Sequence, residues 1–166
     1  MKKLIILLFV MILLLTSCNI NNILSNGESE KIKQMSTDIL TCITENDKES
    51  FKKLFCEQVQ NSPDFDEQVD KAFEYCKGTV YFTDTTINTK ASGGSSTKNG
   101  ERTEWHVYPE IPYFKVVLET DSGDMESHYY AIRYLWYITY EEDKTKEGLH
   151  YLEIELLNVD SMTVGK

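Results

Sequence analysis

Apolar side chains recur every three or four positions in the segment that follows residue 30. Residues 31–45 carry five of them, at Ile32, Met35, Ile39, Leu40 and Ile43. In an α-helix this spacing places the side chains on one face, so the pattern predicts a helix that buries that face.

Two more helices are predicted before the pattern changes. The first begins near Asn46 and fades after Val59. The second begins at Asp64, which precedes a glutamate by three residues in the spacing of a capping box. It ends before Gly78, because glycine is the residue type that most often terminates a helix.

From Gly78 onward the apolar residues alternate with polar ones, as they do in half-buried β-strands. The predicted strands are residues 79–90, 102–108, 113–120, 126–140 and 149–158. The segment ASGGSSTKNGE is predicted to be a loop, and PEIP and DSGD are predicted to be short connections. Short connections make neighbouring strands antiparallel, so the fold class is α+β, with N-terminal helices packed on a curved antiparallel meander sheet.

The alternation also separates the two faces of that sheet. The face expected to meet the helices carries Trp105, Val107, Phe114, Val116, Leu118, Tyr130, Ile132, Tyr134, Trp136, Ile138, Leu152, Ile154 and Leu156. The opposite face carries Lys115, Glu119, Tyr129, Arg133, Leu135, Tyr137, Glu153 and Glu155.

The N-terminus has the pattern of an export signal. Two lysines precede an unbroken apolar run, LIILLFVMILLL, which is too short to span a bilayer comfortably. Leu15-Thr16-Ser17-Cys18 then resembles the lipobox of bacterial lipoproteins, which implies a lipid on the Cys18 thiol. The alternatives are an ordinary signal peptide or an uncleaved anchor. The predicted organisation is a signal peptide over 1–17, a tether over 18–30 and one domain over 31–160, at the outer face of the cytoplasmic membrane.

The net charge and the motifs of the sequence argue against some partners and cofactors. The formal net charge is −10, which argues against nucleic acid as a partner, because binding to phosphates needs lysine and arginine. The sequence has no CxxC or HExxH spacing, so it predicts no metal site and no cofactor. Besides Cys18 there are three cysteines, Cys42, Cys56 and Cys76, and either one disulfide or buried free thiols would fit them.

Several segments together resemble a family of Gram-positive lipoproteins known as a domain of unknown function. They are ENDKESFKKLFCEQ, DFDEQVDKAFEYCKG, GGSSTKNGE, YFKVVLETDSGD and YYAIRYLWYITYEEDKTKEGLHYLEIE. The resemblance implies a cone similar to nuclear transport factor 2 and the cystatins, with a pocket between helix and sheet. It supplies no catalytic residues, and such cones serve as enzymes, ligand carriers and dimerising scaffolds.

These observations predict a non-enzymatic module that binds a small amphipathic ligand or a protein. The residues expected to line a ligand pocket are Trp105, Phe114, Tyr130, Tyr134 and Trp136. The residues expected on an interaction face are Tyr129, Arg133, Leu135 and Tyr137. Arg133 on that face would either pair with Glu153 or Glu155 or contact an anion.

Two other classes of function stay open. One is an enzyme of hydrolase or isomerase type that uses a pocket carboxylate such as Asp84. The other is a homodimeric structural module. The three histidines favour neither, because His106 has the outward phase and His128 and His150 fall at opposite ends of neighbouring strands.

Overall fold

The computed structural model describes residues 27–165. The predicted signal peptide, Cys18 and most of the predicted tether lie outside these residues. Residues 27–30, which the sequence assigned to the tether, are helical and belong to an N-terminal helix described over 27–45. The other helices are α2 (Lys48–Lys52), α3 (Glu57–Gln60) and α4 (Phe65–Tyr75).

Seven strands and two short 3₁₀ turns follow. The strands form one antiparallel, unclosed sheet. The strands are β1 (Thr79–Tyr81), β2 (Ser92–Lys98), β3 (Glu101–Tyr108), β4 (Glu110–Glu119), β5 (Met125–Tyr140), β6 (Gly148–Leu156) and β7 (Asp160–Val164). The turns are η1 (Asp84–Thr86) and η2 (Lys144–Lys146). The predicted α+β class is confirmed.

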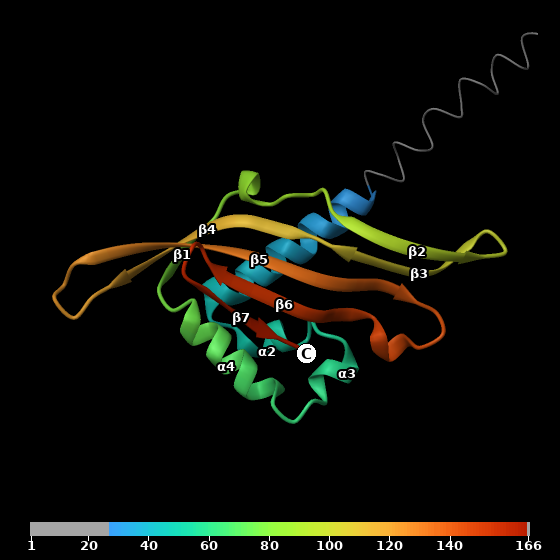
Figure 1. Ribbon diagram of the computed structural model, residues 1–166, viewed down its shortest axis with the longest axis horizontal. Helices are drawn as coiled ribbons and strands as arrows, with labels where there is room; N and C mark the ends of the chain where they lie inside the picture. The colour runs from blue at the N-terminus through green and yellow to red at the C-terminus, as the bar shows by residue number, and fades with distance from the viewer. Residues whose placement is uncertain (1–26, 166) are drawn as a thin grey trace, which may run out of the picture.

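Strand β5 is the centre of the sheet (Figure 1). One of its edges pairs with β6, and the other pairs with β4 along its first half and with β3 along its second half. The prediction that residues 102–108 pair with residues 113–120 is therefore wrong. PEIP does not reverse the chain, because β4 already begins at Glu110 and continues in the direction of β3.

Two predicted segments have a different structure. Residues 79–90 form only the short β1 and then η1, and β1 pairs with β4. The predicted loop over 91–101 contains β2, which forms a hairpin with β3. Asn99 and Gly100 make its turn, and both have positive φ values, of 54° and 85°. These values suit the tight turns that match the twist of a hairpin.

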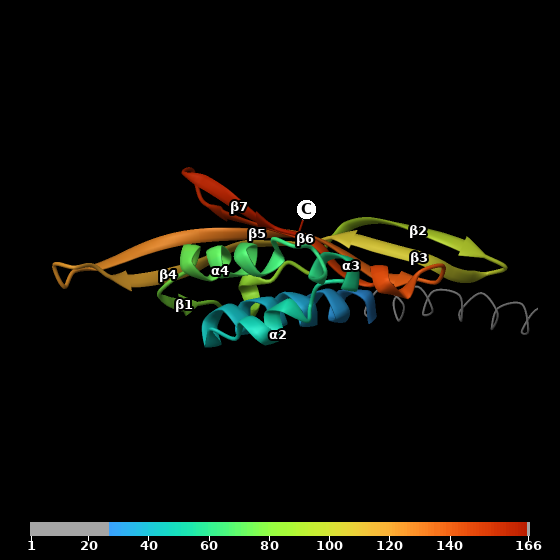
Figure 2. The same ribbon diagram turned by 90° about the horizontal axis from the view of Figure 1, so that it is seen from below.

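The helices lie on one side of the sheet, as Figure 2 shows. Their apolar side chains and the inner face of the sheet form the main core, whose fully buried large side chains include Phe51, Phe114, Ile132 and Leu152. A separate, smaller cluster consists of Ile32, Trp105 and Val107, and we call it the satellite cluster. Trp136 packs against both clusters.

The predicted assignment of the two sheet faces agrees with the burial of most of its members. Phe114, Val116, Tyr130, Tyr134 and Ile154 are buried beneath the helices, while Leu118, Trp136, Ile138 and Leu156 are only half-buried. Side chains nearer the ends of the strands keep more exposure, because the helices cover only the middle of the sheet.

One buried hydrogen bond joins the N-terminal helix to β5. The hydroxyl groups of Ser36 and Tyr134 lie 2.8 Å apart, and the two residues are 0% and 1% exposed. A buried hydroxyl without a partner loses its hydration and gains nothing in return. The pair therefore fixes the position of the helix over the strand more specifically than apolar packing alone.

We expect Ser36→Ala to lower the free energy of unfolding by about 1–3 kcal/mol, because it leaves the Tyr134 hydroxyl buried and unpaired. Tyr134→Phe should cost less, since a helical serine can bond to its own backbone. The double variant should cost less than the sum of the two single changes, as measured by chemical denaturation. Thr37→Ala is the control, because its hydroxyl bonds to Lys33 O on the same helix and its cost should add to that of Tyr134→Phe. Additive costs for the Ser36 pair would contradict the coupling.

Candidate functional site

A pocket opens between the start of the N-terminal helix and the β2–β3 hairpin, and we call it the Trp105 pocket. Its volume is about 440 Å³. Its walls consist of Glu28, Ser29, Ile32, Thr89, Lys90, Ala91, Gly93, Gly94, Ser95, Arg102, Trp105 and Val107. The satellite cluster supplies the apolar part of this lining, and polar groups from the helix and the hairpin supply the remainder.

Two cations flank the indole of Trp105. The Arg102 guanidinium carbon lies 4.5 Å from the ring centroid, and Lys31 Nζ lies 5.2 Å from it. Arg102 also donates a hydrogen bond of 2.8 Å to Glu28 Oε1. Lys90 adds another positive charge to the lining. The pocket lining thus combines an aromatic surface with two cations, Arg102 and Lys90, and one carboxylate, Glu28, which pairs with Arg102.

The five residues predicted to line one ligand pocket lie in different parts of the structure. Trp105 lines the Trp105 pocket, and Trp136 lines a smaller hollow of about 280 Å³ beside Met35. Tyr130 borders a hollow of about 550 Å³ near Gly78, at the far end of the sheet from the Trp105 pocket. Phe114 and Tyr134 are packed within the main core.

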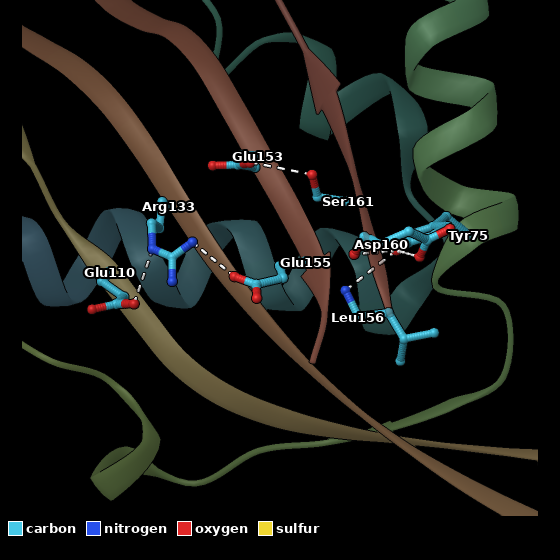
Figure 3. Close-up of polar contacts among 8 residues, drawn as sticks. All are labelled: Tyr75, Glu110, Arg133, Glu153, Glu155, Leu156, Asp160 and Ser161. Carbon is cyan, nitrogen blue, oxygen red and sulfur yellow. Dashed lines mark hydrogen bonds and ion pairs between the residues drawn. The ribbon is translucent and has the colours of Figure 1, made fainter. Parts of the chain in front are cut away.

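The predicted interaction face is the side of the sheet opposite the helices. Tyr129 is half exposed, and Leu135 and Tyr137 are partly exposed. Arg133 lies between two carboxylates, as Figure 3 shows: its Nε is 3.1 Å from Glu110 Oε1 and its Nη1 is 2.7 Å from Glu155 Oε2. The predicted pair with Glu155 is present, and Glu110 is a second partner that the sequence reading missed.

A tyrosine connects α4 to the β6–β7 hairpin (Figure 3). The Tyr75 hydroxyl donates to the backbone oxygen of Asp160 at 3.0 Å, contacts the Asp160 carboxylate, and accepts from Leu156 N at 3.2 Å. Burial and the Asp160 carboxylate both raise the pKa of Tyr75. We therefore interpret Tyr75 as a structural residue that holds the end of the sheet.

Aromatic rings and two imidazoles form a row on the side of the sheet opposite the helices, which we call the open face. Tyr137 lies between His106 and His150, with ring centroids 5.1 Å and 4.5 Å away. His106 Nδ1 lies 3.2 Å from Glu104 Oε1. The sequence reading assigned His106 to the outward phase but did not place it near His150. Both imidazoles contact the Tyr137 ring, and His150 lies where the pairing of β5 with β6 shifts register.

The imidazole of His150 is hydrogen-bonded to the Cys56 thiol, and its Nε2 lies 2.8 Å from Lys146 O. The bond to Cys56 is the main cause that raises the pKa of His150. Burial is the largest single influence on Cys56 and opposes its ionisation, but the bond to His150, the charge of that imidazole and backbone hydrogen bonds at Val59 and Gln58 together outweigh it, so the pKa of this thiol is lowered. No sequence motif marks this pair, because 94 residues separate its members.

All three cysteines of the described chain are free and buried. Burial raises the pKa of Cys76 to about 12, and burial with nearby carboxylates raises the pKa of Cys42 to about 11. Both are therefore neutral packing residues at physiological pH. Of the two alternatives for Cys42, Cys56 and Cys76, the structure has the free thiols.

Asp84, the carboxylate considered for an enzyme, begins η1 rather than lying on a strand, and its side chain is outside what the structure describes. Between residues 27 and 165, no three ligand side chains gather around a metal position. Within the same residues, no helix has the length and apolar content needed to cross a membrane.

We expect Cys56→Ala to lower the pKa of His150 toward its ordinary value, because the substitution removes the hydrogen bond that chiefly raises it. An NMR titration of the imidazole carbon protons measures this shift. Cys42→Ala is the matched control, since Cys42 is also a buried free thiol and its loss should leave the titration unchanged. An unaltered His150 titration in Cys56→Ala would refute the pairing.

Comparison with known proteins identifies a family and leaves its activity open. A search of the curated proteins finds no match. A family model described as a domain of unknown function, DUF5104, matches residues 38–161, which is most of the chain. The match covers α2 to β6 and the beginning of β7, and it includes the β2–β3 hairpin. The chain therefore belongs to the DUF5104 family.

Proposed function

We propose that this protein is a lipoprotein anchored through Cys18 to the outer face of the cytoplasmic membrane. We propose further that its domain is a cystatin-like cone of the nuclear-transport-factor-2 type. Its role is to bind an amphipathic ligand in the Trp105 pocket. Support for the cone comes from the curved, unclosed sheet with its helices on one side and a pocket at one end.

The observation that carries the proposal is the chemistry around Trp105. The indole, Ile32 and Val107 are each less than a tenth exposed, and the small apolar surface that they leave accessible lines the pocket. Arg102 and Lys90 lie beside that surface. A ligand that suits both parts has an apolar portion for the indole and an anionic group for the cations. No group in the pocket is arranged as a nucleophile with its base, so binding fits it better than catalysis.

The position of the pocket agrees with a role near a membrane. Glu28 and Ser29 line it, and Cys18 precedes Glu28 by ten residues. At about 3.5 Å per extended residue, a lipid on Cys18 would keep the pocket within about 35 Å of the bilayer surface. A ligand released from the membrane, or delivered to it, would travel only a short distance.

We expect Cys18→Ser to abolish lipidation, because the hydroxyl of serine is not the thiol that receives the lipid. The wild-type protein should carry the mass of a diacylglyceryl group on residue 18 and enter the detergent phase in a phase partition. The variant should lack that mass and leave the detergent phase. Cys42→Ser, in which a buried thiol is changed, is the control and should partition like the wild type. A Cys18→Ser protein that partitions like the wild type would refute the anchor.

Native mass spectrometry of the full-length protein, released from its host membrane with mild detergent, tests the pocket. We expect a co-purified ligand whose mass is lost from Ser95→Tyr, because Ser95 is an exposed pocket-wall residue and a tyrosine there fills the entrance. Ser96→Tyr is the matched control, since Ser96 lies on the other side of the same strand near Glu104. A wild-type protein without ligand, or a ligand retained by Ser95→Tyr, would argue against binding at this site.

A further inference from the structure

Strand β2 is one of the end strands of the sheet and has one free edge. It pairs with β3 alone, and the described residues place no strand on its other side. Over its seven residues the unpaired edge is about 23 Å long at ~3.3 Å per residue. Such an edge presents a row of N–H and C=O groups that can pair with another extended chain.

The edge of β2 lacks most of the features that usually block such pairing, although its ladder with β3 has one register shift, between Ser96 and Thr97. Its sequence is SGGSSTK, with no proline and one charged residue, at its end. Other edges of the sheet are shorter or covered, and β7, which pairs only with β6, has five residues and packs against α4. Strand β1 has three residues, and the start of β6 is closed by Phe55, whose bridge to Leu149 is flanked by backbone hydrogen bonds. The glycines and serines of β2 also let a partner backbone approach closely.

The free edge lies directly beside the Trp105 pocket. Gly93, Gly94 and Ser95 of β2 form one wall of that pocket. A strand added to β2 would lie about 4.8 Å from it and would turn every second side chain toward the helix side of the sheet. One of those side chains would stand at the mouth of the pocket, within reach of the Trp105 indole.

The size and charge of the Trp105 pocket also indicate which kind of chain pairs with the edge of β2. A second copy that paired through its own β2 would offer only serine, glycine, threonine and a terminal lysine, and these would leave a pocket of about 440 Å³ unfilled. Two copies would also bring together chains that each have a net charge of −10. A different chain with a large apolar side chain and a nearby carboxylate fits both the ring and the cations.

We propose that the ligand of the Trp105 pocket is an extended segment of another protein, which pairs with the edge of β2 as an additional strand. One apolar side chain of this segment inserts beside Trp105, and a carboxylate near it meets Arg102 and Lys90. This inference rests on the proposed binding function and names its ligand class. The backbone pairing supplies affinity for any extended chain, and the pocket supplies the sequence preference.

The test uses the full-length protein in detergent and a fluorescent nine-residue peptide. In the peptide, valine alternates with threonine on opposite faces, and the valine face carries a central phenylalanine and a glutamate two residues later. We expect saturable binding by fluorescence anisotropy, with affinity reduced at least about tenfold in Ser95→Tyr. Ser96→Tyr, the matched change on the other face of β2, should bind like the wild type.

Backbone methylation distinguishes strand pairing from simple insertion of the phenylalanine. Two modified peptides carry N-methyl groups on the odd or on the even residues, so that each loses the hydrogen-bond donors of one edge only. We expect one modified peptide to lose binding much more than the other, because only one edge faces β2. Equal binding of both modified peptides and the parent peptide would overturn strand pairing.

Hydrogen exchange locates the contact. We expect peptide binding to protect alternate amides within residues 92–98, namely those that do not already bond to β3. Protection confined to the open face or to β1 would overturn the inference, and so would a peptide-free dimer whose β2 amides are already protected. If the peptide does not bind but Ser95→Tyr loses a co-purified ligand, the peptide proposal fails and the pocket function stands. If neither peptide nor ligand is bound, both fail.

Discussion

The backbone pairing of β5 is the constraint on which the sheet depends. This strand is hydrogen-bonded to β3, β4 and β6, and the register of these pairings decides which side chains face the helices. A slip by one residue would exchange the two faces. Alternation along β3 turns the Trp105 indole to the helix side and His106 to the other, and the register shift between these two residues sets His106 opposite Tyr137 of β5. The Trp105 pocket and the open-face row thus depend on the same pairing.

The parts of the fold that follow local alternation could be predicted from the sequence. Phe114, Ile132 and Leu152 alternate with polar neighbours, and all three are buried in the main core. The pairing of strands was harder, because it depends on contacts between distant residues. Pro109 and Pro112 were read as marks of a turn, yet the chain passes through both without reversing. The β2–β3 hairpin carried a recognisable signal in Asn99-Gly100, but the small polar residues of β2 resemble a loop.

Only the part of the candidate site that lies on a single predicted strand could be predicted from the sequence. Alternation placed Trp105 on the helix side, and the structure puts it in a pocket. The opposite wall could not be predicted, because Gly93 and Ser95 belong to a segment interpreted as a loop. The Cys56–His150 pair left no local pattern, since the end of a helical segment meets the start of β6 only after folding.

The division of the apolar side chains into two clusters has a consequence for how the domain responds to a ligand. The satellite cluster beneath the β2–β3 hairpin has three buried members, whereas the main core includes residues from α2, α4 and most strands. Regions with few buried apolar contacts open more readily than the whole domain unfolds. The hairpin can therefore act as a separate cooperative unit, linked to the main core through Trp136. Occupation of the Trp105 pocket would then stiffen one arm of the molecule by suppressing the local opening of the hairpin.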